Sequence, residues 1–246
     1  MYADCTQLNS MLERYPGLFE VIVIDCETTG LHHKHRVNGH DRNDYVLQLS
    51  IISAHTGMKI YDGYFKPKIK SWPEAESVNH ISPDFVKDKP TFAAERKKIQ
   101  EIISAARVII GYNVFFDIGF LENSGITFEK CRYFIDVMED YSVYHGDLHP
   151  FYHSFKWQSL IKAANATGYK WGYETKNTAH NSLADVDATL HVAKWLQERH
   201  IEDGWIVYYP PCKNIMEEFY CNQCKLPCRL RDRARVNLHY DKDVKR

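Results

Sequence analysis

The chain has 246 residues, of which 44% are hydrophobic and 26% are charged. This composition is that of an ordinary globular protein, long enough for one large domain plus a small appendage. The formal net charge of −1 is not the basic excess of a nonspecific nucleic-acid binder, so any binding of phosphates must come from local charge.

The sequence argues against membrane and secreted proteins. No apolar stretch approaches the roughly 20 residues that cross a bilayer, and the first five residues lack a signal-peptide pattern. The seven cysteines are odd in number and unevenly spread, unlike a secreted disulfide scaffold. We therefore expect a soluble, cytoplasmic protein with no membrane partner.

Hydrophobic patterning predicts a short run of strands followed by alternating helices and strands. Strands are expected at 20–25, 46–54, 58–66, 107–111 and 132–137, and helices at 92–105, 115–124, 156–168 and 182–200. The second and third strands form a hairpin about Thr56 and Gly57. Antiparallel strands followed by β-α-β units indicate a mixed sheet flanked by helices.

Two carboxylates, Asp25 and Glu27, follow the apolar run 21–24. Because strand side chains alternate between faces, the two carboxylates point the same way. Like charges that share a site need a compensating cation, and Mg²⁺ or Mn²⁺ prefers such oxygen ligands. The alternative is that the pair only ends the strand, with Asp25 opening a turn that Gly30 completes.

Further acidic residues occur later in the chain, next to a predicted strand or at the start of a predicted helix. Asp117 follows the apolar strand near 108–110 and falls in the first turn of an expected helix. Asp185 lies one turn into the strongest helical pattern, and His180 precedes that helix. Ser182 and Asp185 also fit a capping box, which explains Asp185 alone but leaves His180 and the earlier acids unexplained.

In this order the acids resemble the three motifs of the DEDDh 3′–5′ exonucleases, the DnaQ-like group that contains the epsilon-type subunits of DNA polymerase III. The matching segments are Asp25-x-Glu27-Thr28-Thr29-Gly30-Leu31, Asn113-x3-Asp117 and Ala179-His180-Asn181-Ser182-Leu183-Ala184-Asp185. The resemblance spans about residues 20–200. The related DEDDy enzymes carry a Tyr four residues before the last Asp, where this chain has Asn181, so the His subgroup fits better.

The resemblance implies a fold and a reaction. The fold is an α/β, ribonuclease-H-like mixed five-stranded sheet flanked by helices, over a domain of residues 1–203. The reaction is hydrolysis at the 3′ end of a nucleic acid, releasing nucleoside 5′-monophosphates with two divalent cations, Mg²⁺ or Mn²⁺. The implied ligands are Asp25, Glu27, Asp117 and Asp185, with Asp25 as the bridge. His180, with an unperturbed pKa near 6.5, would take the proton from the attacking water.

Three questions about substrate and partner stay open at this point. DNA is the favoured substrate, and an RNA-trimming exoribonuclease is the alternative, because such a site does not by itself reject a 2′-hydroxyl. A non-catalytic nucleic-acid-binding protein on the same fold is a further alternative, disfavoured by the presence of all five motif residues. A polymerase or another replication or repair partner is conceivable, but no docking segment is identifiable.

Candidate substrate-binding residues surround the motifs, namely Thr28, Thr29, His80, Asn113 and Phe116. The segment around His80 resembles the one beside the nucleotide pocket in the family, and the alternative is a capping loop in which Ser82 precedes Pro83. Phe116 could stack on a terminal base, and core packing is its alternative.

Residues 204–246 form an expected Cys-rich basic tail. Its candidate zinc ligands are Cys212, Cys221, Cys224, Cys228 and His239. Free thiols are the alternative to zinc. From 212 to 246 there are nine Lys or Arg and five Asp or Glu, a balance of +4, which could follow a phosphate backbone or could simply be solvated.

Overall fold

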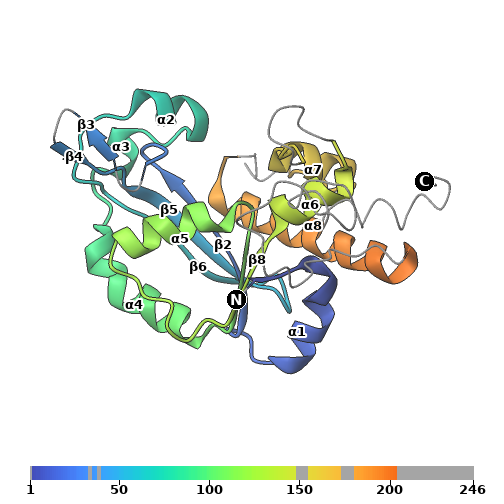
Figure 1. Ribbon diagram of the computed structural model, residues 1–246. Coiled ribbons are helices and arrows are strands. Elements are labelled where there is room, and N and C mark those ends of the chain that lie inside the picture. The colour runs from blue at the N-terminus through green and yellow to red at the C-terminus, as the bar shows by residue number, and fades with distance from the viewer. Residues whose placement is uncertain (1, 33–34, 38–39, 148–154, 173–179, 204–246) are drawn as a thin grey trace, which may run out of the picture.

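The computed structural model describes residues 2–32, 35–37, 40–147, 155–172 and 180–203, and its centre is a mixed sheet (Figure 1). The strand order is β1-β8-β7-β2-β5-β6. The strands are β1 (Tyr2–Ala3), β2 (Val21–Thr28), β5 (Val46–Ser53), β6 (Lys59–Tyr64), β7 (Val108–Gly111) and β8 (Tyr133–Asp136). The last five are the strands that the sequence predicted, and the two-residue β1 extends the sheet beside β8.

Strand directions confirm the expected mixture. β2 runs antiparallel to β5, and β5 antiparallel to β6, whereas β7 runs parallel to both β2 and β8. A separate two-stranded sheet is formed by β3 (His35–Val37) and β4 (His40–Arg42). The mixed α/β architecture inferred from the sequence is therefore confirmed.

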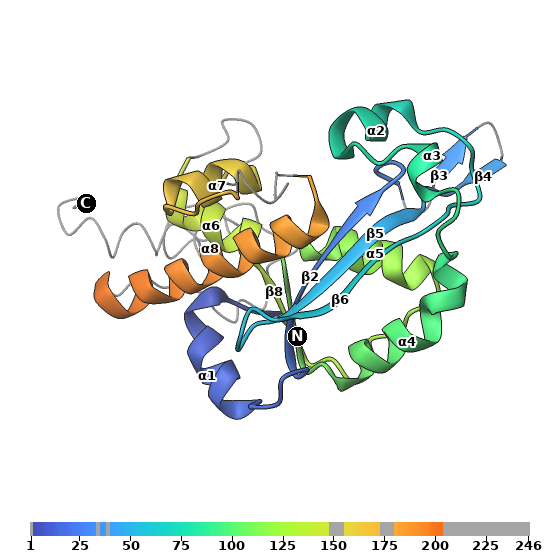
Figure 2. The same ribbon diagram turned by 180° about the vertical axis from the view of Figure 1, so that it is seen from behind.

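Helices cover both faces of the sheet (Figure 2). They are the 3-10 helix η1 (Cys5–Gln7), α1 (Leu8–Arg14), α2 (Pro73–Asn79), α3 (Pro83–Val86), α4 (Phe92–Ala105), α5 (Val114–Asn123), α6 (Val137–His145), α7 (Leu160–Ala166) and α8 (Ser182–Asp203). One core packs α1, α6, α7 and α8 on one face, and a second core packs α4 and α5 on the other. Helices α2 and α3 lie beyond the carboxyl end of β2.

The alternation of β2 decides where its carboxylates point. Val21 and Val23 belong to the core under α8, whereas Ile22, Ile24 and Cys26 belong to the core under α4 and α5. Asp25 and Glu27 continue the parity of Val21 and Val23, so both face the α8 side. The strand does not end at residue 25 as expected; pairing with β5 continues to Thr28, which places both acids inside the strand.

Some of the predicted helices were confirmed, and others were wrong in length or missed. Helix α4 has the bounds predicted for it, and Ser82 caps α3 by accepting a hydrogen bond from the Phe85 N–H. The helix expected at 156–168 is the shorter α7, and α1, α2 and α6 were not expected. The proposed tail and its zinc ligands lie outside the described residues. Each helix within the described ranges is too short or too polar to cross a membrane.

The packing of helices on both faces of the sheet yields a stability prediction on α4. Ile99 is fully buried against the sheet, whereas Lys97 on the same helix is exposed. Ile99→Ala should lower the free energy of unfolding by about 2–5 kcal/mol, the usual cost of removing such a buried side chain. Lys97→Ala should change it by less than about 0.5 kcal/mol. Urea denaturation measures both, and equal losses would contradict the assignment of the buried face.

Candidate metal and catalytic site

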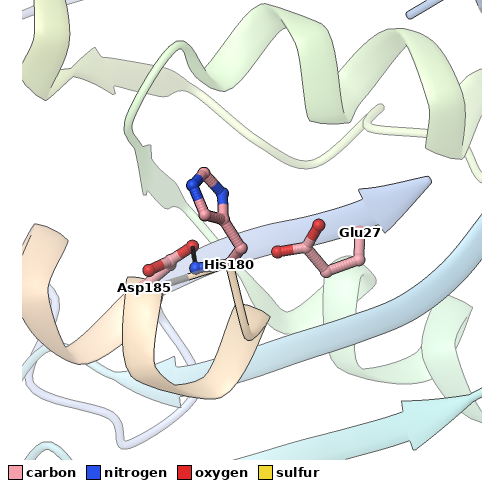
Figure 3. Close-up of side chains that lie close together, drawn as sticks. All are labelled: Glu27, His180 and Asp185. Carbon is pink, nitrogen blue, oxygen red and sulfur yellow. Dashed lines mark hydrogen bonds between the residues drawn. The ribbon is translucent and has the colours of Figure 1, made fainter. Parts of the chain in front are cut away.

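The motif residues meet at the end of β2, beside the first turn of α8. Glu27, His180 and Asp185 each offer a ligand atom within 4.8 Å of the other two (Figure 3). The Glu27 carboxylate on β2 is turned toward the N-terminal turn of α8, which carries Asp185. Two segments more than 150 residues apart in the sequence thus form one cluster of potential metal ligands.

Asp117 joins this cluster along the edge of the sheet. Strand β7 pairs with β2 only as far as Val23, so within the described part of the chain the following stretch of β2 has no strand partner on that side. The Asp117 carboxylate of α5 takes that place and accepts a hydrogen bond from the Cys26 N–H at 2.9 Å. Because Cys26 lies between Asp25 and Glu27, this bond holds Asp117 beside both acids.

Burial and mutual repulsion shape the electrostatics of the four acids. Burial raises the pKa of Asp25 well above its usual value, and repulsion from Asp117, Asp185 and Glu27 raises it further. Burial, with repulsion from Asp185 and Asp117, raises the pKa of Glu27 to about 8. Burial raises the pKa of Asp185 to about 7, although the His180 N–H opposes this shift. The four carboxylates therefore share one electrostatic environment that favours a bound cation.

Asp185 shows how well the site suits a cation. Its Oδ2 accepts a hydrogen bond from the His180 N–H at 3.2 Å. Its Oδ1 is buried and has no hydrogen-bond partner among the described residues. A buried carboxylate oxygen without a hydrogen-bond partner is unfavourable unless a cation compensates it, so the donor set fits a hard divalent ion.

Buried polar side chains dock the start of α8 onto β5 and β6. The Ser182 and Ser50 hydroxyls lie 2.7 Å apart, and Ser50 donates to Asp62 Oδ1 at 3.1 Å. Because Ser50 uses its proton on the carboxylate, Ser182 donates to Ser50. Gln48 Oε1 accepts from the Ser182 N–H at 3.3 Å, while its Nε2 donates to Asp62 at 3.0 Å. This network fixes the helix that carries Asp185.

The capping interpretation of Ser182 was wrong in detail. Asn181 caps α8, since its Oδ1 accepts from the Leu183 N–H at 3.2 Å. Ser182 is already helical, and its hydroxyl points to Ser50. Asp185 does reach back to a backbone N–H, as the acid of a capping box does, but that N–H belongs to His180.

Asn79 is a site residue that the sequence reasoning missed. It is buried, its Nδ2 donates to the Thr28 carbonyl at 3.1 Å, and its Oδ1 accepts from the Ile81 N–H at 3.1 Å. A hydrogen bond from the Asn79 side chain also lowers the pKa of Glu27, opposing the larger effect of burial. Asn79 thus ties α2 to the strand that carries the acids.

All three non-glycine residues with positive φ in the described ranges border the site. They are His80 (φ 59°), Asn113 (φ 64°) and His180 (φ 66°). His80 ends α2 directly after Asn79, and Asn113 begins the helix of Asp117. The left-handed conformation costs such residues about 1–3 kcal/mol each and is found preferentially at functional sites.

The five candidate substrate residues have different surroundings. The Thr28 hydroxyl donates to the Gly30 carbonyl at 2.6 Å, and the Thr29 hydroxyl accepts from the Tyr45 N–H at 2.9 Å, so both hold the loop after β2. His80 is exposed. The Asn113 N–H donates to Asp136 at 3.0 Å. Phe116 is half-buried, and its ring lies 4.9 Å from the ring of Phe120. Contacts of these residues with a substrate stay predictions.

Comparison with known proteins connects this geometry to named relatives. The chain is 31% identical over 104 residues to the DNA polymerase III subunit epsilon of Escherichia coli, covering 41% of each chain. It is 30% identical over 186 residues to the PolC-type DNA polymerase III of Lacticaseibacillus paracasei, covering 73% of this chain and 11% of that one. The chain thus spans well under half the length of these relatives.

Solved structures share the fold. An E. coli ExoI–ssDNA complex superposes with a TM-score of 0.54 at 22% identity, covering 74% of this chain and 41% of that one. The Pan2 pseudoubiquitin hydrolase–RNA exonuclease module of Saccharomyces cerevisiae superposes with a TM-score of 0.53 at 15% identity, covering 74% and 29% of the two chains. At these identities the likeness shows the fold alone.

The family itself is shown by a longer match. The model of the RNase_T family, described as exonuclease, matches residues 22–193, more than two thirds of the chain. The matched span begins in β2 and ends in α8, so it includes every motif residue of the site. The chain belongs to the RNase_T exonuclease family.

Proposed function

We propose that the protein is a metal-dependent 3′–5′ exonuclease that hydrolyses phosphodiester bonds at the 3′ end of DNA and releases nucleoside 5′-monophosphates. The observation that carries the proposal is the convergence of Asp25, Glu27, Asp117 and Asp185 at the end of β2 with His180 beside them. Because the chain belongs to an exonuclease family, phosphodiester hydrolysis is the reaction expected at this cluster.

The carboxylates would hold two divalent cations, Mg²⁺ or Mn²⁺. Asp25 repels, and is repelled by, each of the other three acids, which suits it to a bridging position. Asp185 offers Oδ1, which has no hydrogen-bond partner among the described residues, and the Glu27 carboxylate is turned toward the first turn of α8, which carries Asp185. When bound, such cations supply positive charge that activates water and neutralises the leaving oxygen.

His180 is the proposed general base. Its side chain is exposed and lies within the cluster formed with Glu27 and Asp185. Its backbone is held by the N–H bond to Asp185, so the imidazole projects from a fixed point at the start of α8. An imidazole there can take the proton of a water that attacks the terminal phosphodiester.

The choice of DNA rests on the names of the sequence relatives. Those matched at about 30% identity are DNA polymerase III proteins, whereas the RNA exonuclease module shares only the fold. A polymerase partner for this chain stays a prediction, because the shared region is under half of the epsilon subunit. The cytoplasmic location and the zinc-binding tail also stay predictions.

The first prediction concerns catalysis. His180→Ala should lower kcat by about 10²- to 10⁴-fold, the usual contribution of a general base. Asp25→Ala should cause a larger loss, because it removes a ligand that both cations would share. A 5′-labelled single strand assayed with Mg²⁺, Mn²⁺ or EDTA measures both, with exposed Met58→Ala as the control. Full activity in either site variant, or activity that survives EDTA, would refute the assignment.

The second prediction concerns pH and metal. The folded-state pKa values of Glu27 and Asp185, about 8 and about 7, lie above the unfolded values of 4.5 and 3.8. The folded chain therefore binds more protons than the unfolded chain between about pH 4 and pH 8. In EDTA the free energy of unfolding should fall as the pH rises through this window, and saturating Mn²⁺ should restore it.

Urea denaturation at several pH values tests this linkage. Other buried acids also have raised pKa values, so the comparison that isolates the site is Glu27→Gln, which should flatten the pH dependence in EDTA and weaken the effect of Mn²⁺. A pH dependence and a Mn²⁺ response identical to those of the wild type would show that Glu27 does not share the charged cluster.

The third prediction concerns the substrate. Matched single-stranded DNA, duplex DNA and RNA, each labelled at either end, should show stepwise shortening from the 3′ end with DNA preferred. Thin-layer analysis of the product should show nucleoside 5′-monophosphates. Faster digestion of RNA would replace the DNA assignment with the exoribonuclease alternative, and shortening from the 5′ end would contradict the proposed polarity.

A further inference from the structure

An aromatic and basic surface lies beside the cluster, on elements that the proposed catalysis does not use. We call it the Phe85 surface, and it consists of Tyr64, Lys66, Phe85 and Lys89. Phe85 on α3 is 50% exposed, and its ring lies 4.9 Å from the Tyr64 ring in an edge-to-face contact. The Lys89 ammonium lies 5.2 Å from the centre of the Phe85 ring.

The Phe85 surface is connected directly to the candidate site. Tyr64 pairs with Gln48, and Gln48 pairs with Glu27, so Tyr64 lies in the same cross-strand row as a site carboxylate. The Tyr64 hydroxyl accepts a hydrogen bond from Asn181 Nδ2 at 3.2 Å, and Asn181 directly follows His180. Helix α3 lies beyond the carboxyl end of β2, where the carboxylates gather (Figure 2).

The charge of the surface matches a phosphate backbone. Lys66 and Lys89 are both exposed, and the two segments that carry them are joined by the hydrogen bond from the Lys66 N–H to the Pro90 carbonyl at 2.9 Å. Among the described residues neither lysine forms an ion pair with a carboxylate, whereas Lys87, directly after α3, is paired with Asp84 at 3.5 Å. The ammonium groups of Lys66 and Lys89 are therefore available to bind phosphates beside a half-exposed aromatic ring.

We propose that the Phe85 surface binds the single strand upstream of its 3′-terminal nucleotide, with a base stacked on Phe85 and phosphates beside Lys66 and Lys89. Single-strand binding sites combine aromatic platforms with basic groups in this way. An isolated exposed Phe is common on protein surfaces and needs no explanation. Phe85 differs because Tyr64 supports its ring and connects it to the start of α8. The inference rests on the proposed function, since the strand is placed by its 3′ end in the carboxylate cluster.

The experiment compares Phe85→Ala with Phe19→Ala. Phe19 is also exposed, at 43%, but precedes β2 at the end of the strand opposite to the site. Binding of a fluorescent oligothymidylate in Ca²⁺ without hydrolysis is measured by anisotropy, and kcat and KM are measured with Mn²⁺. Phe85→Ala should weaken binding and raise KM about tenfold, within the range for loss of one stacked base. Phe19→Ala should match the wild type.

Two further variants separate stacking from folding. Phe85→Trp should keep or strengthen binding, whereas Phe85→Leu, which retains an apolar contact for Tyr64, should weaken it as Phe85→Ala does. Lys89→Gln should reduce the slope of log K against log salt concentration by about 0.7, the value for one phosphate contact on a single strand. Wild-type binding by both Phe85→Ala and Phe85→Leu, or equal loss in Phe19→Ala, would overturn the proposal.

The proposed function and this inference fail in different ways. Hydrolysis of a p-nitrophenyl ester of thymidine 5′-monophosphate, which has no upstream nucleotide, reports the carboxylate cluster without the Phe85 surface. If the wild type cleaves neither this ester nor the oligonucleotide, the proposed function fails. The anisotropy comparison needs no hydrolysis, so the loss of binding in Phe85→Ala would still support the surface, and unchanged binding would still refute it.

Discussion

The structure depends on holding four like charges together at the end of one strand. Burial raises the pKa of every acid in the cluster, and repulsion from the other cluster acids raises those of Asp25 and Glu27 further, so each carboxylate needs local compensation in the folded protein. The chain supplies it through hydrogen bonds: the Cys26 N–H to Asp117, the His180 N–H to Asp185, and the Asn79 side chain to Glu27. These donors reduce the repulsion, but among the described residues Asp185 Oδ1 has no partner, and a bound cation would compensate the remaining negative charge.

The rest of the fold keeps these groups in register. Helix α8 buries a long apolar face against the sheet, and its first turn is tied to β5 by Ser182, Ser50 and Gln48. Asp62 anchors that network from β6, and Tyr64 on the same strand contacts Asn181. Since three residues bordering the site adopt strained backbone conformations, the packing of α8 and α5 must outweigh their cost. The same docking brings α3, and with it Phe85, to the side of the site.

Local patterns predicted the part of the site that lies within single elements. The alternation of β2 indicated that Asp25 and Glu27 share a face, and the apolar strand near 108–110 placed Asp117 at a helix start.

Contacts between distant elements were not predictable in this way. Asn79 lies in a segment that drew attention to His80, but the turn at the end of α2 leaves His80 exposed and Asn79 buried. Helix α6 was missed because its buried positions include Asp140 and Ser142, which blur the apolar period. Gln48 and Ser50 interrupt the apolar strand β5 at a spacing of two, which indicates a polar contact on one face of that strand. The sequence does not reveal that their partner is Ser182 on α8, because that contact depends on how α8 packs in the fold.

We propose that these carboxylates hold divalent cations. Anomalous diffraction from crystals soaked in Mn²⁺ is the sharpest test, because manganese is located independently of the protein atoms. We expect an anomalous peak bounded by oxygens of Asp25, Glu27 and Asp185, and loss of that peak in Asp185→Asn crystals. Manganese bound elsewhere on the protein, with no peak among these carboxylates, would refute the proposal.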